Sequence, residues 1–124
     1  GEMIRDFTYI DDIVESLYLL LFKPATPDNS FLKEAPCAAS SWASHRIFNI
    51  GNSKPTPLMD YIKAIEDELG IKAIKKYLPM QPGDVKVTSS NNELLERWIG
   101  FRPNTPIEEG VSKFITWYRE YYEV

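Results

Sequence analysis

The residue of this sequence best suited to hold an anion is Arg5, at the start of a strand-like stretch. It opens the run Arg5-Asp6-Phe7-Thr8-Tyr9-Ile10-Asp11-Asp12, in which a short apolar strand leads directly into two aspartates and a helix. A guanidinium on a rigid strand can grip a phosphate or a carboxylate with two parallel hydrogen bonds. The alternative is an ordinary strand-to-helix junction in which Arg5 pairs with Asp6 or Asp11. The residues of this run leave both interpretations open.

Other catalytic chemistry has little support in the residues. Gly51 and Gly83 stand alone, so no glycine-rich loop matches a dinucleotide or phosphate-binding fingerprint. The single cysteine, Cys37, and the single histidine, His45, cannot build a zinc site at this spacing. We interpret Cys37 as a thiol without a catalytic role, because no partner that would activate it can be assigned. We therefore predict no catalytic residue, no cofactor-binding residue and no metal site within these residues.

The composition is that of a globular protein. Its 124 residues, 44% hydrophobic and 26% charged, fit a single domain with its own core. The net charge of -4, with acids and bases interspersed, argues against a nucleic-acid surface. The longest apolar run, residues 18–22, is far shorter than the roughly 20 residues that span a bilayer. With no signal-peptide pattern and one cysteine, we expect a cytoplasmic protein without a membrane or nucleic-acid partner.

Apolar spacing and breaker residues predict four helices. Pro24 ends the first helix, and Gly70 and Gly100 end the second and third. We expect Thr56 to cap the second helix, with Pro57 in its first turn, and the capping-box pattern of residues 90–93 to open the third. The expected spans are from Asp11 or Asp12 to 23, from 57 to 69, from the 90–93 box to 99, and from 106 to 122.

Three or so short strands complete the expected fold, over residues 3–10, 46–50 and 72–78. Residues 25–44 have no period, and an irregular stretch of about 20 residues is uncommon in a compact domain unless it is functional or disordered. Strands and helices do not alternate as they do in a doubly wound sheet, so the sequence predicts an α+β domain. The residues expected on buried helix faces are Ile13, Val14, Leu17, Leu20 and Leu21 near the start, and Ile107, Val111, Phe114, Ile115 and Tyr118 near the end.

Three segments resemble the C-terminal, substrate-binding region of extended short-chain dehydrogenase/reductase sugar-nucleotide epimerases. They are the run 5–12 described above, then Phe48-Asn49-Ile50-Gly51-Asn52-Ser53, then Met80-Gln81-Pro82-Gly83-Asp84. The resemblance covers essentially all 124 residues. It is closest to the UDP-glucuronate 4-epimerase branch, which serves bacterial capsule and envelope polysaccharide synthesis.

This resemblance implies a two-domain enzyme of which residues 1–124 are the single substrate-binding domain. In such relatives an N-terminal Rossmann domain holds NAD and carries a Tyr-x-x-x-Lys pair, whose tyrosine removes a proton as hydride passes from sugar C4 to NAD. That pair does not occur in this sequence. The fragment is therefore expected to be inactive alone and to act with the Rossmann domain of its own chain on a UDP-sugar. The full-length enzyme is expected to be a homodimer.

The resemblance also carries roles to four residues. Arg5 matches an arginine that contacts the nucleotide diphosphate, and Asp84 matches an acid that accepts hydrogen bonds from ribose hydroxyls, presented by the turn at Gly83. Gln81 stands where galactose-type epimerases have a second phosphate-binding arginine, and glutamine is typical of the glucuronate branch. A neutral amide still donates hydrogen bonds but loses the charge-assisted part of the interaction.

Two other functions stay open at this point. The chain resembles a superfamily that also contains dehydratases and decarboxylases of nucleotide sugars, whose distinguishing residues lie mostly outside this region. A free-standing binding module without an enzymatic partner is the alternative from a different class of protein.

Overall fold

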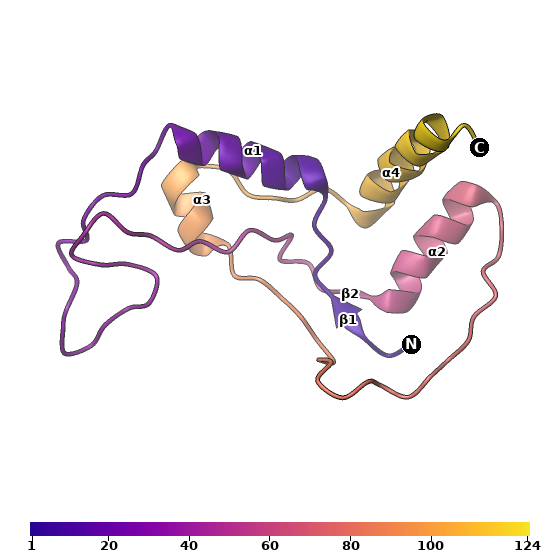
Figure 1. Ribbon diagram of the computed structural model, residues 1–124, viewed down its shortest axis with the longest axis horizontal. Coiled ribbons are helices and arrows are strands. Elements are labelled where there is room, and N and C mark those ends of the chain that lie inside the picture. The colour runs from indigo at the N-terminus through magenta and orange to yellow at the C-terminus, as the bar shows by residue number, and fades with distance from the viewer.

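The computed structural model describes all residues 1–124 and shows an α+β fold (Figure 1). The α+β class and the four helices predicted from the sequence are confirmed. A single small sheet takes the place of the three expected strands. In chain order the elements are β1 (Ile4–Arg5), α1 (Ile10–Leu21), β2 (Thr56–Pro57), α2 (Leu58–Leu69), α3 (Glu93–Ile99) and α4 (Ile107–Tyr122).

Strand β1 lies between two segments that are distant in the sequence. On one edge it pairs antiparallel with β2, with Arg5 opposite Thr56. On the other edge Ile4 forms a parallel bridge with Val87, and its N–H donates to the carbonyl of Lys86 at 2.9 Å. This double pairing brings residues 84–88 beside the strand that carries Arg5.

Most of the predicted strand residues are not in strands. The strand expected over 3–10 is limited to Ile4–Arg5, and those expected over 46–50 and 72–78 do not form. Arg46 makes only an isolated bridge with Ser40, and the N–H of Ala73 donates to the carboxylate of Glu66 at 3.0 Å. A strand needs a neighbouring backbone as its partner, and these segments have side chains or short bridges in that place.

The C-terminal ends of the helices follow the sequence signals better than the N-terminal ends do. Gly70 and Gly100 adopt φ of +69° and +72°, the left-handed conformation that commonly terminates a helix, as predicted. The predicted N-caps are wrong, because in none of the helices does the side chain of the N-cap residue accept a backbone N–H. Thr56 and Pro57 form β2, and the side chain of Asn91, outside α3, accepts the Glu93 N–H at 2.9 Å.

The helices pack in two separate groups, which Figure 1 shows side by side. Helix α1 contacts α3, and α2 contacts α4 and β2. Only eleven of the 124 residues are buried, so the core is small. Its apolar members, two on α3 and two on α4, are Leu95, Ile99, Val111 and Ile115.

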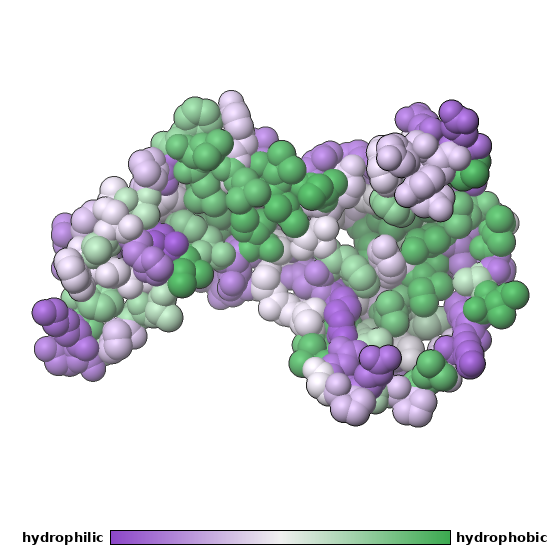
Figure 2. All heavy atoms as spheres, viewed as in Figure 1, coloured by the Kyte–Doolittle hydropathy of each residue, from purple (hydrophilic) through white to green (hydrophobic).

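Helix α1 has its polar stripe inside and its apolar stripe outside. Asp12 and Ser16 are buried, whereas Val14, Leu17 and Leu21 are 55%, 52% and 77% exposed. The prediction that the apolar stripe of this helix is buried is therefore wrong for these residues, because no element of the chain covers it. Figure 2 shows the resulting apolar patch over the region of α1.

Helix α4 shows the same feature in part. Val111 and Ile115 are buried as predicted, but Phe114 and Tyr118 are 50% and 43% exposed. None of the four helices has the length and apolar composition needed to cross a membrane.

Candidate functional site

The carboxylate of Asp6 ties three segments together beside Arg5. It accepts backbone N–H groups from Ser53 at 3.0 Å, Lys54 at 3.3 Å and Ser90 at 2.9 Å. Gly51 is needed at this junction, because a Cβ atom there would lie 2.7 Å from the Ser90 Cβ. The Asp6 carboxylate is thus occupied by backbone N–H groups, a structural role that could not be inferred from the sequence.

Asp12 has a comparable role at the start of α4. Its carboxylate accepts the N–H groups of Asn104 at 3.2 Å and Thr105 at 3.0 Å. These bonds explain why a carboxylate is tolerated inside α1, since a buried charge needs hydrogen-bond partners. Two aspartates of the opening run therefore position backbone and leave Arg5 to another partner.

That partner lies on a tight turn formed by residues 81–84. The N–H of Asp84 donates to the carbonyl of Gln81 at 3.1 Å, with Pro82 and Gly83 between them. Gly83 has φ of +87°, which makes this a type II turn, with proline and glycine at their preferred positions. The turn presents the side chain of Asp84, whose Oδ1 also accepts the N–H of Val85 at 2.8 Å.

Arg5 and Asp84 meet in an ion pair across 79 residues of sequence. The Arg5 Nη2 lies 2.8 Å from the Asp84 Oδ1, and the two side chains are 22% and 38% exposed. The sequence alternative in which Arg5 pairs with Asp6 or Asp11 is wrong in its choice of partner. The structure brings Arg5, Gln81, Gly83 and Asp84 into one neighbourhood.

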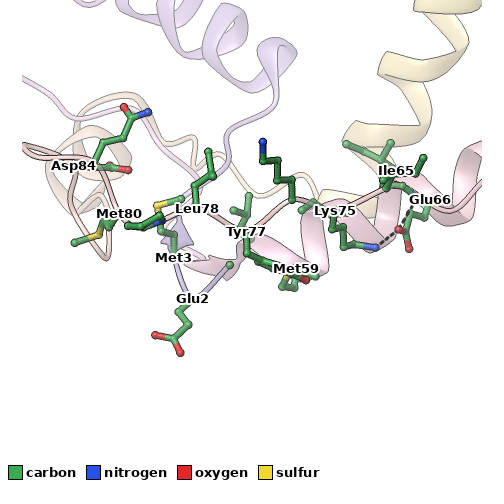
Figure 3. A pocket seen from close by; sticks show the side chains of 18 of the residues that line it. Glu2, Met3, Met59, Ile65, Glu66, Lys75, Tyr77, Leu78, Met80 and Asp84 are labelled. Carbon is green, nitrogen blue, oxygen red and sulfur yellow. Dashed lines mark hydrogen bonds and ion pairs between the residues drawn. The ribbon is translucent and has the colours of Figure 1, made fainter.

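A groove of about 1320 Å³ opens beside this pair, between α2 and the extended segment 71–81. Gln81 and Asp84 line it, whereas Arg5 and Gly83 do not. In Figure 3, Asp84 and Met80 stand at one end of the groove, and the ion pair of Lys75 with Glu66 stands at the other. The apolar side chains of the groove are Met3, Leu58, Met59, Ile62, Ile65, Leu69, Ile71, Ala73, Ile74, Tyr77, Leu78 and Met80.

Glu66 fastens the far end of this groove. It is only 7% exposed and binds the ammonium groups of Lys75 and Lys72 and the N–H of Ala73. The Lys75 hydrogen bond, with those from Ala73 and Lys72, lowers the pKa of Glu66 to about 2. Sequence reasoning missed this residue, since a glutamate within a helix gives no signal of lysines six and nine positions later.

The chemistry available at this site is recognition of a polar ligand. A guanidinium matches phosphate oxygens, and a carboxylate accepts hydrogen bonds from hydroxyl groups. The residues do not fit a dinucleotide, because no glycine-rich turn joins a strand to a helix here. Cys37 and His45 are both exposed in the irregular segment 24–46, and this segment lies away from β1 in Figure 1.

Comparison with solved structures places the fold. A variant of UDP-glucuronic acid 4-epimerase from Bacillus cereus, in complex with UDP-4-deoxy-4-fluoro-glucuronic acid and NAD, matches with a TM-score of 0.75. The match is 24% identical and covers 98% of this chain and 34% of that chain. No protein-family model matches the sequence. The fold is that of the C-terminal domain of NAD-dependent nucleotide-sugar epimerases and dehydratases.

Proteins with similar sequences point to a smaller group of nucleotide-sugar enzymes. Protein CapI of Staphylococcus aureus is 48% identical over 123 residues, which are 99% of this chain and 37% of that protein. A probable UDP-glucuronate 4-epimerase of Rhizobium meliloti is 42% identical over 98% of this chain and 36% of its own length. The chain thus spans little more than a third of these relatives. Over almost its whole length the chain is similar to the C-terminal region of nucleotide-sugar epimerases, UDP-glucuronate 4-epimerases among them.

Proposed function

We propose that this chain binds the nucleotide part of a UDP-sugar, as the substrate-binding region of a NAD-dependent UDP-glucuronate 4-epimerase. The observation that carries the proposal is the meeting of Arg5 and Asp84 beside the groove. The 42% identity to a probable UDP-glucuronate 4-epimerase supports this substrate. The dehydratase and decarboxylase alternatives and the free-standing module have no comparable observation in their favour.

Each of the four residues then has a distinct task. Arg5 holds the diphosphate through charge-assisted hydrogen bonds, and Asp84 accepts hydrogen bonds from the ribose hydroxyls. Gly83 allows the type II turn that points Asp84 at the ligand. Gln81, which lines the groove beside Asp84, donates its amide to a phosphate oxygen without adding charge.

Under this proposal residues 1–124 form one domain of a longer protein. The residues of this chain do not fit NAD, so we assign the cofactor and the proton-transferring residues to the part of the relatives that this chain does not cover. That part would be a Rossmann domain of the same chain, and the complete enzyme would be a homodimeric isomerase. When bound, NAD supplies the hydride acceptor for the sugar. The expected cytoplasmic location stays a prediction.

A chimaera tests the proposed function. The N-terminal part of the Rhizobium meliloti relative, up to the residue aligned with Gly1, would be joined to this chain. We expect the chimaera to convert UDP-glucuronate into UDP-galacturonate and Arg5→Ala to raise the KM, with roughly a tenfold to hundredfold loss of kcat/KM because a charged hydrogen bond is removed. A chimaera that folds and retains NAD but leaves UDP-glucuronate unchanged would contradict the proposal.

The isolated chain provides a second test. Supplied with NAD and UDP-glucuronate, it should form no UDP-galacturonate, because the proposal places the hydride acceptor and the proton-transferring tyrosine elsewhere. Product formation by the purified 124-residue chain would show that the catalytic residues are within it, against the proposal.

A further inference from the structure

The guanidinium of Arg5 is already occupied in this structure. Nη1 donates to the backbone carbonyls of Ile4 at 3.0 Å and Lys86 at 3.2 Å. Nη2 contacts the Met3 Sδ at 3.2 Å and donates to the Asp84 Oδ1 at 2.8 Å. These contacts use both terminal nitrogens, and a guanidinium has only one further N–H, on Nε. A phosphate that takes two parallel hydrogen bonds from Arg5 must therefore displace a partner on a terminal nitrogen.

Asp84 and the weakly accepting Met3 thioether are the partners that can be displaced, and Asp84 is the charged one of the two. The two backbone carbonyls belong to β1 and the segment paired with it, so they are fixed by the sheet. Asp84 instead ends a turn, and its side chain is 38% exposed. Its Oδ1 is shared by Arg5 and the Val85 N–H, while its Oδ2 makes no hydrogen bond. One carboxylate oxygen is thus open to a hydroxyl donor before Arg5 is released.

We propose that Asp84 is a specificity-determining residue that admits nucleoside diphosphates to Arg5 and disfavours anions that lack a ribose. This inference rests on the proposed function, because it requires that Arg5 binds phosphate and Asp84 binds ribose. A bare anion that replaces Asp84 at the guanidinium leaves the carboxylate without its cation. A nucleotide has two vicinal ribose hydroxyl groups, which donate hydrogen bonds to the Asp84 carboxylate. Its phosphate at the same time accepts hydrogen bonds from the Arg5 guanidinium.

The exposure of the Arg5–Asp84 ion pair sets how strongly Asp84 is expected to disfavour anions that lack a ribose. Partly exposed ion pairs interact modestly, because water screens both charges. Removing the carboxylate should therefore raise the affinity of a ribose-free anion by about threefold to tenfold. The same change should lower the affinity for UDP, because the ligand then loses a charged acceptor.

The test uses two probes, UDP and inorganic pyrophosphate, titrated into the 124-residue chain and followed by the backbone amide resonances of residues 4–6 and 81–88. In Asp84→Asn we expect tighter pyrophosphate binding and weaker UDP binding than in the wild type. The control is Glu120→Gln, which removes the same charge from an exposed α4 residue that makes no ion pair. Its affinities for both probes should equal those of the wild type.

A measurement on the unmodified chain avoids any effect of substitution on folding. At the same concentration below saturation, the Arg5 Nε–H resonance should move further with UDP than with pyrophosphate. Equal movement with both probes, or no gain of pyrophosphate affinity in Asp84→Asn beyond Glu120→Gln, would overturn the inference. If UDP binds in either case, the proposed function stands without it; if UDP does not bind the wild type, both fail.

Discussion

At the scale of single residues, carboxylates organise this protein by accepting backbone N–H groups. Asp6 gathers the backbone of Ser53, Lys54 and Ser90 around β1, and Asp12 fixes the backbone before α4. A carboxylate can accept several N–H groups at once, which makes aspartate suitable for joining loops that form no sheet. Asp84 is the carboxylate of this region that pairs with Arg5 and is left for a ligand.

The close approach at Gly51 gives a prediction on stability. In Gly51→Ala the new methyl group would lie 2.7 Å from the Ser90 Cβ and 3.1 Å from the Asp6 Oδ2. We expect a loss of about 1–3 kcal/mol in the free energy of unfolding, measured by urea denaturation, because the junction must open. The double variant Gly51→Ala with Ser90→Gly should recover part of this loss. Independent, additive effects of the two substitutions would contradict the steric explanation.

Glu66 gives a prediction on pH dependence. Its pKa is lowered from an ordinary value of 4.5 to about 2, so it binds fewer protons in the folded chain than in the unfolded chain. Its stabilising contribution is therefore complete above about pH 5 and is lost as the pH falls toward about 2. We expect Glu66→Gln to be less stable than the wild type at neutral pH, with the difference in unfolding free energy shrinking over that range. A difference that is constant with pH would argue against the ion pairs with Lys72 and Lys75.

At the scale of elements, the turn 81–84 is the part that shapes the site. It is held by one backbone hydrogen bond and by the positive φ of Gly83, and a Cβ atom at Gly83 would point into open space. Its conformation therefore depends on local backbone preferences more than on packing. Because Asp84 is the last residue of the turn, the turn sets where the carboxylate meets Arg5.

Substitution of Gly83 separates backbone conformation from other effects. Gly83→Ala should lower UDP affinity several-fold, because a Cβ at this φ costs roughly 1 kcal/mol and shifts the turn. Gly83→Asn should keep most of the affinity, since asparagine tolerates positive φ better than alanine. Calorimetric titration with UDP measures both variants. Equal affinities of the Gly83→Ala and Gly83→Asn variants would indicate that the turn conformation does not matter for binding.

The elements also show which parts of the fold could be predicted from the sequence. The helices were predictable because apolar spacing and the stop residues Gly70 and Gly100 are local signals. The strands over 46–50 and 72–78 were not, because a strand depends on a partner that lies elsewhere in the sequence. The helix caps were mistaken because the expected residues have other roles: Thr56 lies in β2, and the Ser90 hydroxyl donates to the Asn92 Oδ1 at 2.9 Å.

At the scale of the whole molecule, large apolar surfaces are uncovered. The outward stripe of α1 and the aromatic side chains of α4 are about half exposed or more, and Figure 2 shows an apolar area over α1. Exposed apolar areas of this kind usually mark a surface that another polypeptide covers. The proposed Rossmann domain is the partner that fits this expectation.

We expect the isolated chain to self-associate through these surfaces. Leu17→Lys, on the exposed side of α1, should shift sedimentation toward the monomer without changing the helix content, because Leu17 is not part of the buried core. Glu68→Gln changes the net charge by one unit in the same direction at an exposed position of α2 and serves as the control. A wild-type chain that is monomeric at all concentrations would contradict this expectation.

The site shows the limit of reasoning from residues alone. Arg5 could be recognised as a suitable anion ligand, but its partner is 79 residues away, on a turn whose Pro82-Gly83 pair predicts a bend and not a ligand. The motif resemblance named Asp84 and Gly83 where periodicity and spacing could not. The occupied state of the guanidinium appears only in three dimensions, because it depends on the carbonyls of Ile4 and Lys86.

The most direct measurement of the central claim is a titration of the labelled wild-type chain with UDP, followed by two-dimensional NMR. We predict saturable shifts centred on Arg5 and on residues 81–84, with weak affinity because part of the pocket belongs to the uncovered portion of the relatives. The amides of α3 and of the segment 24–46 should stay unchanged. Absence of shifts at Arg5 and Asp84 up to millimolar UDP, or shifts centred elsewhere, would contradict the assignment of this chain as a nucleotide-sugar binding region.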